Sequence, residues 1–329
     1  MFLLRFAMRS RTNDHQERAA LHRAAIDMCR WADEQPNCIS IVVSEHHASP
    51  DGYLPSPMVL ASAFAGATQR VPINVSALLL ANYEPVKLAE DMAVLDLVSG
   101  GRVSYVIGAG YVEREFEMFG VDAKRRGALI EEKVAVLRQA WTGEPFELDG
   151  RRVHVQPAPL SARGPMLAYG GSSPAAAKRA ARLGLYFMSQ VDKPELGAVY
   201  RAEAERAGTR AVGCYFPPSS MPKTVFVADD VDAAWDELGE YLMVDAAGYA
   251  EWNDYRTDIS AISAAASVEQ LRAEEGEYRV FTPDAALELL ASGSVLALQP
   301  LVGGIPPEVA WPYLHRAAEV SQLAASTKA

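Results

Sequence analysis

The sequence has only three cysteines in 329 residues, Cys29, Cys38 and Cys214, and they show neither CxxC nor zinc-type spacing. This excludes a disulfide framework and favours free, mostly buried thiols in a reducing compartment. No apolar run approaches the ~18 residues that cross a bilayer. The opening stretch MFLLRFAMRSR is too short for a signal peptide and is interrupted by an arginine. We therefore expect a soluble, cytoplasmic protein with no membrane partner.

Basic residues are also scarce. The chain has 31 Lys and Arg against 42 Asp and Glu, a formal net charge of −11, and no basic patch that could neutralise phosphates. We therefore expect no nucleic-acid partner. Half of the residues are hydrophobic, which is enough for a sizeable core, and the 22% of charged residues is ordinary for an enzyme.

Short β-rich runs alternate with helical patterns along the whole chain. About eight strands are each followed by a helix, which favours a single α/β domain over residues 1–329, a TIM-type (β/α)8 barrel. The expected strands are Phe2–Met8, Ile39–Ser44, Ile73–Leu80, Val103–Ile107, Met166–Tyr169, Tyr186–Ser189, Thr224–Ala228 and Val295–Leu301. The expected helices are His15–Gln35, Pro57–Gln69, Pro85–Ser99, Ala123–Thr142, Val231–Met243, Pro283–Ala291 and Pro307–Leu323, with two more starting at Pro174 and Pro194.

Two segments depart from this alternation. Residues 146–160 look like an inserted hairpin with Asp149-Gly150 at its turn. Residues 248–276 are rich in alanine and serine and are expected to be irregular.

In such barrels the chemistry lies at the carboxyl ends of the strands. Glu45-His46-His47 follows the second strand directly, and three titratable side chains in a row are a poor way to build a core. Adjacent residues on a strand point to opposite faces, so His46 and His47 cannot both face one metal ion. No HExxH occurs, and we expect no metal site. We favour a polar lining with one histidine available for proton transfer; ordinary loop hydrogen bonding is the alternative.

Two glycine-containing loops follow the fourth and fifth strands. Gly170-Gly171-Ser172-Ser173 precedes Pro174, so a serine N-cap and a proline start a helix behind two glycines. Free amides, two hydroxyls and close backbone approach make this an anion site, most simply for a phosphate. Gly108-Ala109-Gly110 is no dinucleotide fingerprint but permits close approach of a flat or phosphorylated ligand.

Several stretches together resemble the bacterial luciferase-like family of flavin oxidoreductases, over most of the chain. The stretches are SEHHASPDGYLPSP, SALLLANYEPVKLAEDMAVLDLVSGGR, GAGYVEREFEMFGVD, LAYGGSSPAAAKRAARLG and LQPLVGGIPPEVAW. The family includes monooxygenases that use reduced FMN and dehydrogenases or reductases that use the deazaflavin coenzyme F-420. Both groups share the barrel and hold the flavin at its carboxyl mouth.

The resemblance assigns roles to the strand ends. It implies that His46 is the catalytic residue beside the flavin ring, with Glu45 and His47 in the cofactor site. It implies a non-proline cis peptide at Ser76-Ala77 beneath the ring. It implies that Gly170, Gly171, Ser172 and Ser173 bind the cofactor phosphate, together with the loop of Gly108, Ala109, Gly110 and Tyr111.

The cofactor stays undecided between FMN and coenzyme F-420. Luciferase has an arginine in the strand-four loop that grips the FMN phosphate, and this chain has Ala109 at about that place. The resemblance further implies a small organic substrate, a homodimer and, if the cofactor is FMN, a separate flavin reductase. A non-catalytic flavin-binding protein of the same fold is the alternative reading, and a metal-dependent barrel hydrolase is a more distant one.

Overall fold

The computed structural model describes residues 1–218, 221–253 and 262–326. Ten strands form one sheet in the order β11-β10-β12-β1-β2-β3-β4-β7-β8-β9, and every recorded ladder in it is parallel. Their bounds are β1 (Phe2–Phe6), β2 (Cys38–Val43), β3 (Ile73–Leu78), β4 (Val103–Ile107), β7 (Met166–Gly170), β8 (Tyr186–Met188), β9 (Cys214–Tyr215), β10 (Thr224–Val227), β11 (Tyr278–Phe281) and β12 (Leu296–Leu298). Within the described ranges no ladder joins β9 to β11, the two ends of this order.

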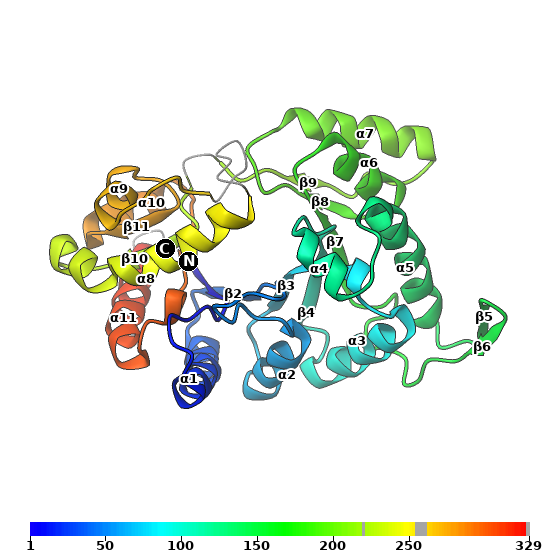
Figure 1. Cartoon of the computed structure of the whole chain (residues 1–329), viewed down its shortest axis with the longest axis horizontal. Coiled ribbons are helices and arrows are strands. Elements are labelled where there is room, and N and C mark those ends of the chain that lie inside the picture. The colour runs from blue at the N-terminus through cyan, green and yellow to red at the C-terminus, as the bar shows by residue number, and fades with distance from the viewer. Residues whose placement is uncertain (219–220, 254–261, 327–329) are drawn as a thin grey trace.

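Helices surround the curved sheet, with α1, α2 and α3 along one side and α8 to α11 on another (Figure 1). Their bounds are α1 (His15–Glu34), α2 (Pro57–Ala67), α3 (Pro85–Ser99), α4 (Glu113–Met118), α5 (Arg126–Ala140), α6 (Pro174–Arg182), α7 (Glu195–Ala207), α8 (Val231–Trp252), α9 (Val268–Ala273), α10 (Pro283–Ala291) and α11 (Pro307–Ser326). Three short 3₁₀ turns are η1 (Leu80–Asn82), η2 (Ala123–Arg125) and η3 (Val302–Gly304). None of the described helices is long and apolar enough to cross a membrane.

Alternation along β1 shows how sheet and helices meet. Phe2, Leu4 and Phe6 are fully buried, whereas the residues between them are only half-buried. The Phe2 ring stacks on Trp31 of α1 with 6.2 Å between centroids, and Phe6 tilts against Phe64 of α2 at 5.4 Å. One face of β1 therefore packs on two helices, as aromatic pairs at these distances do in protein cores.

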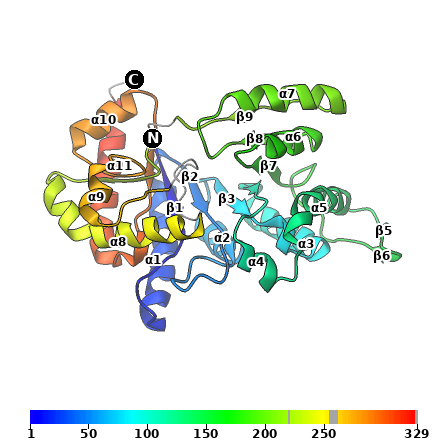
Figure 2. The same cartoon turned by 45° about the horizontal axis from the view of Figure 1, so that its top comes forward.

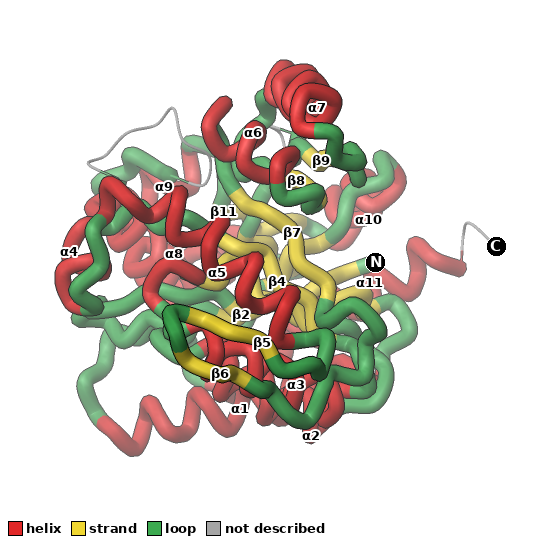
Figure 3. Tube along the Cα trace, turned by 90° about the vertical axis from the view of Figure 1, so that its right-hand side faces the viewer, coloured by secondary structure: helices red, strands yellow, loops and turns green. Residues whose placement is uncertain are grey.

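The hairpin predicted from Asp149-Gly150 is present. Strands β5 (Phe146–Leu148) and β6 (Arg151–Val153) pair antiparallel and lie outside α5, apart from the main sheet (Figures 2 and 3). Asp149 and Gly150 both have positive φ, 50° and 72°, the conformation that a tight two-residue turn requires.

The predicted irregular segment is the main correction. Helix α8 continues through Gly248 to Trp252, and α9 covers Val268–Ala273, so the expectation is wrong for these residues; residues 254–261 lie outside the described ranges. Gly248 was misleading because an isolated glycine usually weakens a helix. Here a Cβ at Gly248 would lie 1.8 Å from the Nη1 atom of the buried Arg9, so only glycine leaves room for that side chain.

The remaining differences between the prediction and the structure are elements too short to show a periodic pattern in the sequence. Strands β9 and β11 and helix α4 were not predicted, since two to six residues give too few repeats to reveal a period. Among the residues that the structure describes, the main sheet has ten strands, where the pattern gave about eight.

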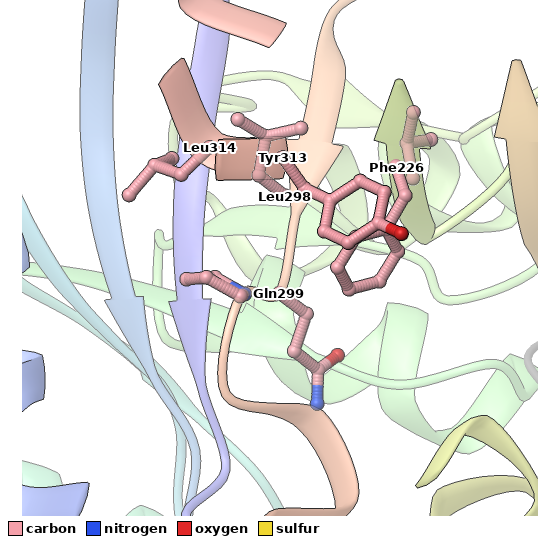
Figure 4. A pocket seen from close by; sticks show the side chains of 7 residues that line it. Phe226, Leu298, Gln299, Tyr313 and Leu314 are labelled. Carbon is pink, nitrogen blue, oxygen red and sulfur yellow. The ribbon is translucent and has the colours of Figure 1, made fainter. Parts of the chain in front are cut away.

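Two hollows lie away from the histidines. One, of about 10 Å³ and so no larger than a water site, is enclosed by β10, β12 and α11, with Gln299 beside the rings of Phe226 and Tyr313 (Figure 4). The other is a surface cleft of about 600 Å³ at the amino ends of β7 and β8, lined by Arg138, Trp141, Thr142, Ala162, Arg163, Gly164, Pro165, Met166, Leu167, Gly184 and Leu185.

The backbone conformations at two glycines can be tested by substitution. Gly100 ends α3 in the left-handed conformation, with φ of 64°, and Gly66 lies within α2; neither has an atom within 4 Å of an added Cβ. Gly100→Ala should lower the free energy of unfolding by about 1 kcal/mol, because left-handed backbone is strained for alanine. Gly66→Ala should raise it by about 0.5–1 kcal/mol through helix propensity. Urea denaturation measures both, and equal effects would contradict the assigned conformations.

Candidate active site

The strand ends named from the sequence lie along one edge of the sheet. Strands β1, β2, β3, β4 and β7 are consecutive neighbours and all parallel, so their carboxyl ends share that edge. Glu45, His46 and His47 follow β2, the 108–111 loop follows β4, and the 170–173 loop follows β7. The topology therefore brings all the predicted site segments to one side of the molecule.

Glu45 is almost fully buried, and its carboxylate oxygens contact several hydrogen-bonding groups of the protein. Its Oε2 accepts a hydrogen bond from the backbone N–H of Leu79 at 2.7 Å. Its Oε1 accepts from the Tyr83 hydroxyl at 2.8 Å and contacts His47 Nε2 at 2.7 Å. Burial, followed by the repulsion of the Glu45 charge, raises the pKa of the Tyr83 phenol. Glu45 thus joins β2, His47 and the segment after β3 into one rigid unit.

His46 is held by a different carboxylate. Its Nδ1 lies 2.8 Å from Oε1 of Glu115 in α4, and the same oxygen accepts the backbone N–H of His47 at 2.7 Å. The Nε2 atom lies 3.4 Å from the Tyr111 hydroxyl. The two adjacent histidines therefore reach different acids, Glu115 and Glu45. Within the described part of the chain, no group of three or more His, Cys, Asp and Glu side chains could hold a metal ion.

Aromatic rings surround the His46 imidazole. Trp252 lies 4.2 Å from it between centroids, Tyr53 4.9 Å, Tyr111 5.5 Å and Tyr249 6.4 Å. Trp252 and Tyr249 belong to the last turns of α8, the yellow helix that runs from the left-hand group of helices toward the middle of the molecule in Figure 1.

A buried arginine fixes this aromatic wall. Arg9 is 1% exposed and pairs with Asp51 and with Asp245 of α8, the latter at 3.0 Å. Its guanidinium also lies over the rings of Tyr249 and Trp252, at 4.8 and 4.2 Å. Burial alone would lower the pKa of Arg9, but attraction to Asp245 and its other neighbours raises it overall, so the guanidinium stays charged. Arg9 therefore docks the end of α8 against the loop that follows β1.

The ends of β3 and β4 approach each other closely. The Ser76-Ala77 peptide is cis, as the resemblance implied, and a Cβ on Gly108 would lie 2.7 Å from Cβ of Ala77. Gly110 has a φ of 73°, and a Cβ there would lie 2.8 Å from the Phe116 ring. Both glycines are therefore required by local geometry, whatever ligand the loop binds. Ala109 is half-buried between them.

The loop after β7 has the geometry expected of an anion site. The Ser173 hydroxyl caps α6 by accepting the backbone N–H of Ala176 at 3.2 Å, and Pro174 occupies the first turn. A Cβ on Gly171 would lie 2.5 Å from that of Ala176. Gly170 and Gly171 are half-buried, and the Ser172 hydroxyl is buried without a hydrogen-bond partner. An unpaired buried hydroxyl beside a helix N-terminus fits a phosphate oxygen.

Further unpaired polar atoms lie on the segments that follow β3 and β4. They are both amide atoms of Asn82, Nε of Arg114 and Oε2 of Glu115. Buried polar groups in native proteins are nearly always paired, so unpaired ones along the edge that carries Ser172 are consistent with a bound polar ligand. The residues present therefore fit a phosphorylated cofactor.

Sequence reasoning named Tyr111 but missed Glu115, Arg9 and the other aromatic residues around His46. Glu115 lies in the quoted stretch GAGYVEREFEMFGVD, and Arg9 directly follows the first strand end. Both positions were visible as charged residues near strand ends. The partners of these two residues could not be recognised in the sequence. His46 lies 69 residues from Glu115, and Asp245, which pairs with Arg9, lies on α8.

Comparison with known proteins gives a consistent result. A sequence model of the family described as luciferase-like monooxygenase matches residues 38–293, more than half of the chain. The oxygenase component of the flavin-dependent trigonelline monooxygenase of Acinetobacter baylyi is 28% identical over 147 residues, 44% of this chain and 40% of that protein. The alkanal monooxygenase alpha chain of Photorhabdus luminescens is 31% identical over 146 residues, 43% of this chain and 41% of that protein. The chain thus spans less than half the length of these curated relatives.

Solved structures match over nearly the whole chain. The oxygenating constituent of 3,6-diketocamphane monooxygenase from Pseudomonas putida, in complex with FMN, has a TM-score of 0.70 at 21% identity, covering 98% of this chain and 96% of that one. An F420-dependent secondary alcohol dehydrogenase, in complex with an F420-acetone adduct, has a TM-score of 0.60 at 18% identity, covering 94% and 97%. At these identities the likeness establishes the fold, and the predicted luciferase-like TIM barrel is confirmed.

Proposed function

The chain belongs to the luciferase-like monooxygenase family, and on that premise we propose that it is a flavin-dependent oxidoreductase acting on a small organic substrate. The cofactor is either FMN, in a monooxygenase, or the deazaflavin coenzyme F-420, in a dehydrogenase or reductase. When bound, either group supplies the redox chemistry.

The observation that carries the proposal is the placement of His46 and the 170–173 loop on the same edge of the sheet. Strands β2 and β7 are three positions apart in the sheet order, with β3 and β4 between them. At ~4.8 Å per strand this is a span of about 14 Å. Such a span suits a ligand with a flat ring at one end and a phosphate on a flexible chain at the other.

Each segment along this span takes a part in the proposed site. Ser172, Ser173 and the N-terminus of α6 bind the phosphate, with Gly170 and Gly171 allowing close approach. Gly108–Tyr111 and the cis Ser76-Ala77 peptide support the middle and the ring. Glu45 and His47 form the rigid floor beside the ring, and His46 handles a proton of the substrate.

We also propose a homodimer formed through α2 and α3. These helices pack against each other, and their outer surfaces expose large apolar side chains: Val59, Val94, Leu97 and Val98, between 43% and 71% exposed. Contiguous exposed apolar residues are characteristic of protein interfaces. If the cofactor is FMN, a separate flavin reductase supplies it in reduced form; a relative described as an oxygenase component supports this arrangement.

Location and organisation complete the proposal. All three cysteines are free, Cys29 and Cys38 of them buried, which supports a reducing cytoplasm. One domain over residues 1–329 is supported by a sheet in which β1 pairs with both β2 and β12, so that the two ends of the chain share one core.

The phosphate site is tested by Ser172 and Ser173. Ser172→Ala should weaken FMN or coenzyme F-420 binding by about 1–3 kcal/mol without destabilising the protein, since its hydroxyl has no protein partner. Ser173→Ala should in addition lower the unfolding free energy by about 1 kcal/mol, because it removes the cap of α6. Titration of each variant with both cofactors also identifies the preferred one. Unchanged affinity in Ser172→Ala would move the phosphate to the Gly108–Tyr111 loop.

The roles of the two histidines are tested by His46→Ala and His47→Ala. His46→Ala should keep the fold and cofactor affinity but lower turnover by about 10²–10⁴-fold, the usual contribution of a positioned acid or base. His47→Ala should mainly lower the melting temperature, because it removes the contact with the buried Glu45. Turnover is followed by dioxygen uptake with reduced FMN and by absorbance of the deazaflavin with a substrate pool. A folded but inactive His47→Ala beside a fully active His46→Ala would reverse the assignment.

The dimer is tested by placing charge on its proposed interface. Sedimentation velocity at micromolar concentration should show a dimer for the parent chain and a monomer for the double variant Val59→Glu with Val98→Glu, since two buried carboxylates per subunit would be unpaired. Met166→Glu changes a residue that is 66% exposed elsewhere on the surface and should leave the dimer intact. A monomeric parent chain would refute the proposal.

A further inference from the structure

We propose that Glu115 is a positioning residue for His46: it keeps the proton of the neutral imidazole on Nδ1, so that Nε2 is the proton acceptor. This inference rests on the proposed function for the catalytic role of His46, but its geometric part concerns the protein alone. Glu115 comes from α4 and His46 from the end of β2, so the pairing depends on the fold.

The contacts at a single oxygen determine the direction of the hydrogen bond. Oε1 of Glu115 receives the backbone N–H of His47 at 2.7 Å, and a backbone amide can only donate. Nδ1 of His46 lies 2.8 Å from the same oxygen. A carboxylate oxygen that already accepts one hydrogen bond accepts a second readily, so Nδ1 carries a hydrogen, and in the neutral imidazole Nε2 then carries none.

The other side of the ring agrees with this assignment. The Tyr111 hydroxyl lies 3.4 Å from Nε2, a long contact, and the Tyr111 residue is 46% exposed. Burial of the hydroxyl end raises the pKa of this phenol, so it keeps its hydrogen and is available as a donor to a bare Nε2. Because this contact is weak and the Tyr111 side chain is exposed, a substrate group can displace the Tyr111 hydroxyl from Nε2.

Glu115 is also poorly explained as a purely structural residue. It is 1% exposed, yet its Oε2 has no hydrogen-bond partner. Leaving one oxygen of a buried carboxylate unpaired costs stability. A residue chosen for stability alone would be satisfied at both oxygens, as Glu45 is by Leu79, Tyr83 and His47.

The proton balance is simple. A proton on a substrate oxygen or nitrogen moves to Nε2, so that bond to hydrogen breaks as the Nε2–H bond forms. The ring becomes an imidazolium whose second N–H still faces Glu115, and the carboxylate offsets its positive charge. Glu115 itself neither gains nor loses a proton in this step.

The test begins with nuclear magnetic resonance of ¹⁵N-histidine-labelled protein, which reads the tautomer without any substrate. Of the signals from the six histidines, those of His46 are identified by their absence in His46→Ala. We expect the parent protein to carry hydrogen on Nδ1 of His46. Glu115→Gln keeps an acceptor oxygen and should keep this tautomer, whereas Glu115→Met removes the acceptor and should move the hydrogen to Nε2. The matched control Glu117→Met makes the same change at an exposed position of α4 and should alter nothing.

Turnover then separates this inference from the proposed function. Glu115→Met should lower kcat by about 10- to 10³-fold with a smaller effect on KM, as expected when a base is held in the wrong tautomer. Hydrogen on Nε2 in the parent protein, or on Nδ1 in a folded Glu115→Met variant, would overturn the positioning role. If Glu115→Met does not fold, the tautomer of the parent protein still decides the matter. A His46→Ala variant with full turnover would instead refute the proposed function while the tautomer result stands.

Discussion

Every recorded ladder of the ten-strand sheet is parallel, and this constraint shapes the rest of the molecule. Parallel neighbours cannot be joined by a tight turn, so the chain must cross back outside the sheet, usually through a helix, before the next strand begins. All carboxyl ends then fall on one edge, where segments that are distant in sequence meet. His46 and Glu115 meet there because β2 and β4 are separated only by β3.

Much of this arrangement could be predicted from the sequence because it is determined locally. Ser173 as N-cap followed by Pro174 favours a helix start, and Asp149-Gly150 favours a tight turn. Helix α3 and strand β4 were predicted to the residue, since Pro85 begins the helix, Gly100 ends it and Gly108 follows the strand. The site segments could be predicted as well, because each of them lies at the end of a predicted strand.

The contacts that give the site its geometry could not be predicted in this way. Glu115 sits in a helix of six residues, too short for a periodic signal, and its partner His46 is known only once the sheet order is known. The group of aromatic side chains around His46 includes Trp252 and Tyr249, and the pairing of Arg9 with Asp245 places both of them. A buried cation between two carboxylates is a property of the folded chain, and neither end of it shows a pattern in sequence.

The close approach of Arg9 to Gly248 has a consequence for the divergence of this protein from its relatives. The two positions compete for one volume, because a Cβ at 248 would lie 1.8 Å from the guanidinium. A larger residue at 248 is therefore compatible only with a shorter one at position 9, and a long basic side chain at position 9 requires glycine in the helix. The two positions should covary across orthologues, although they lie far apart in the sequence.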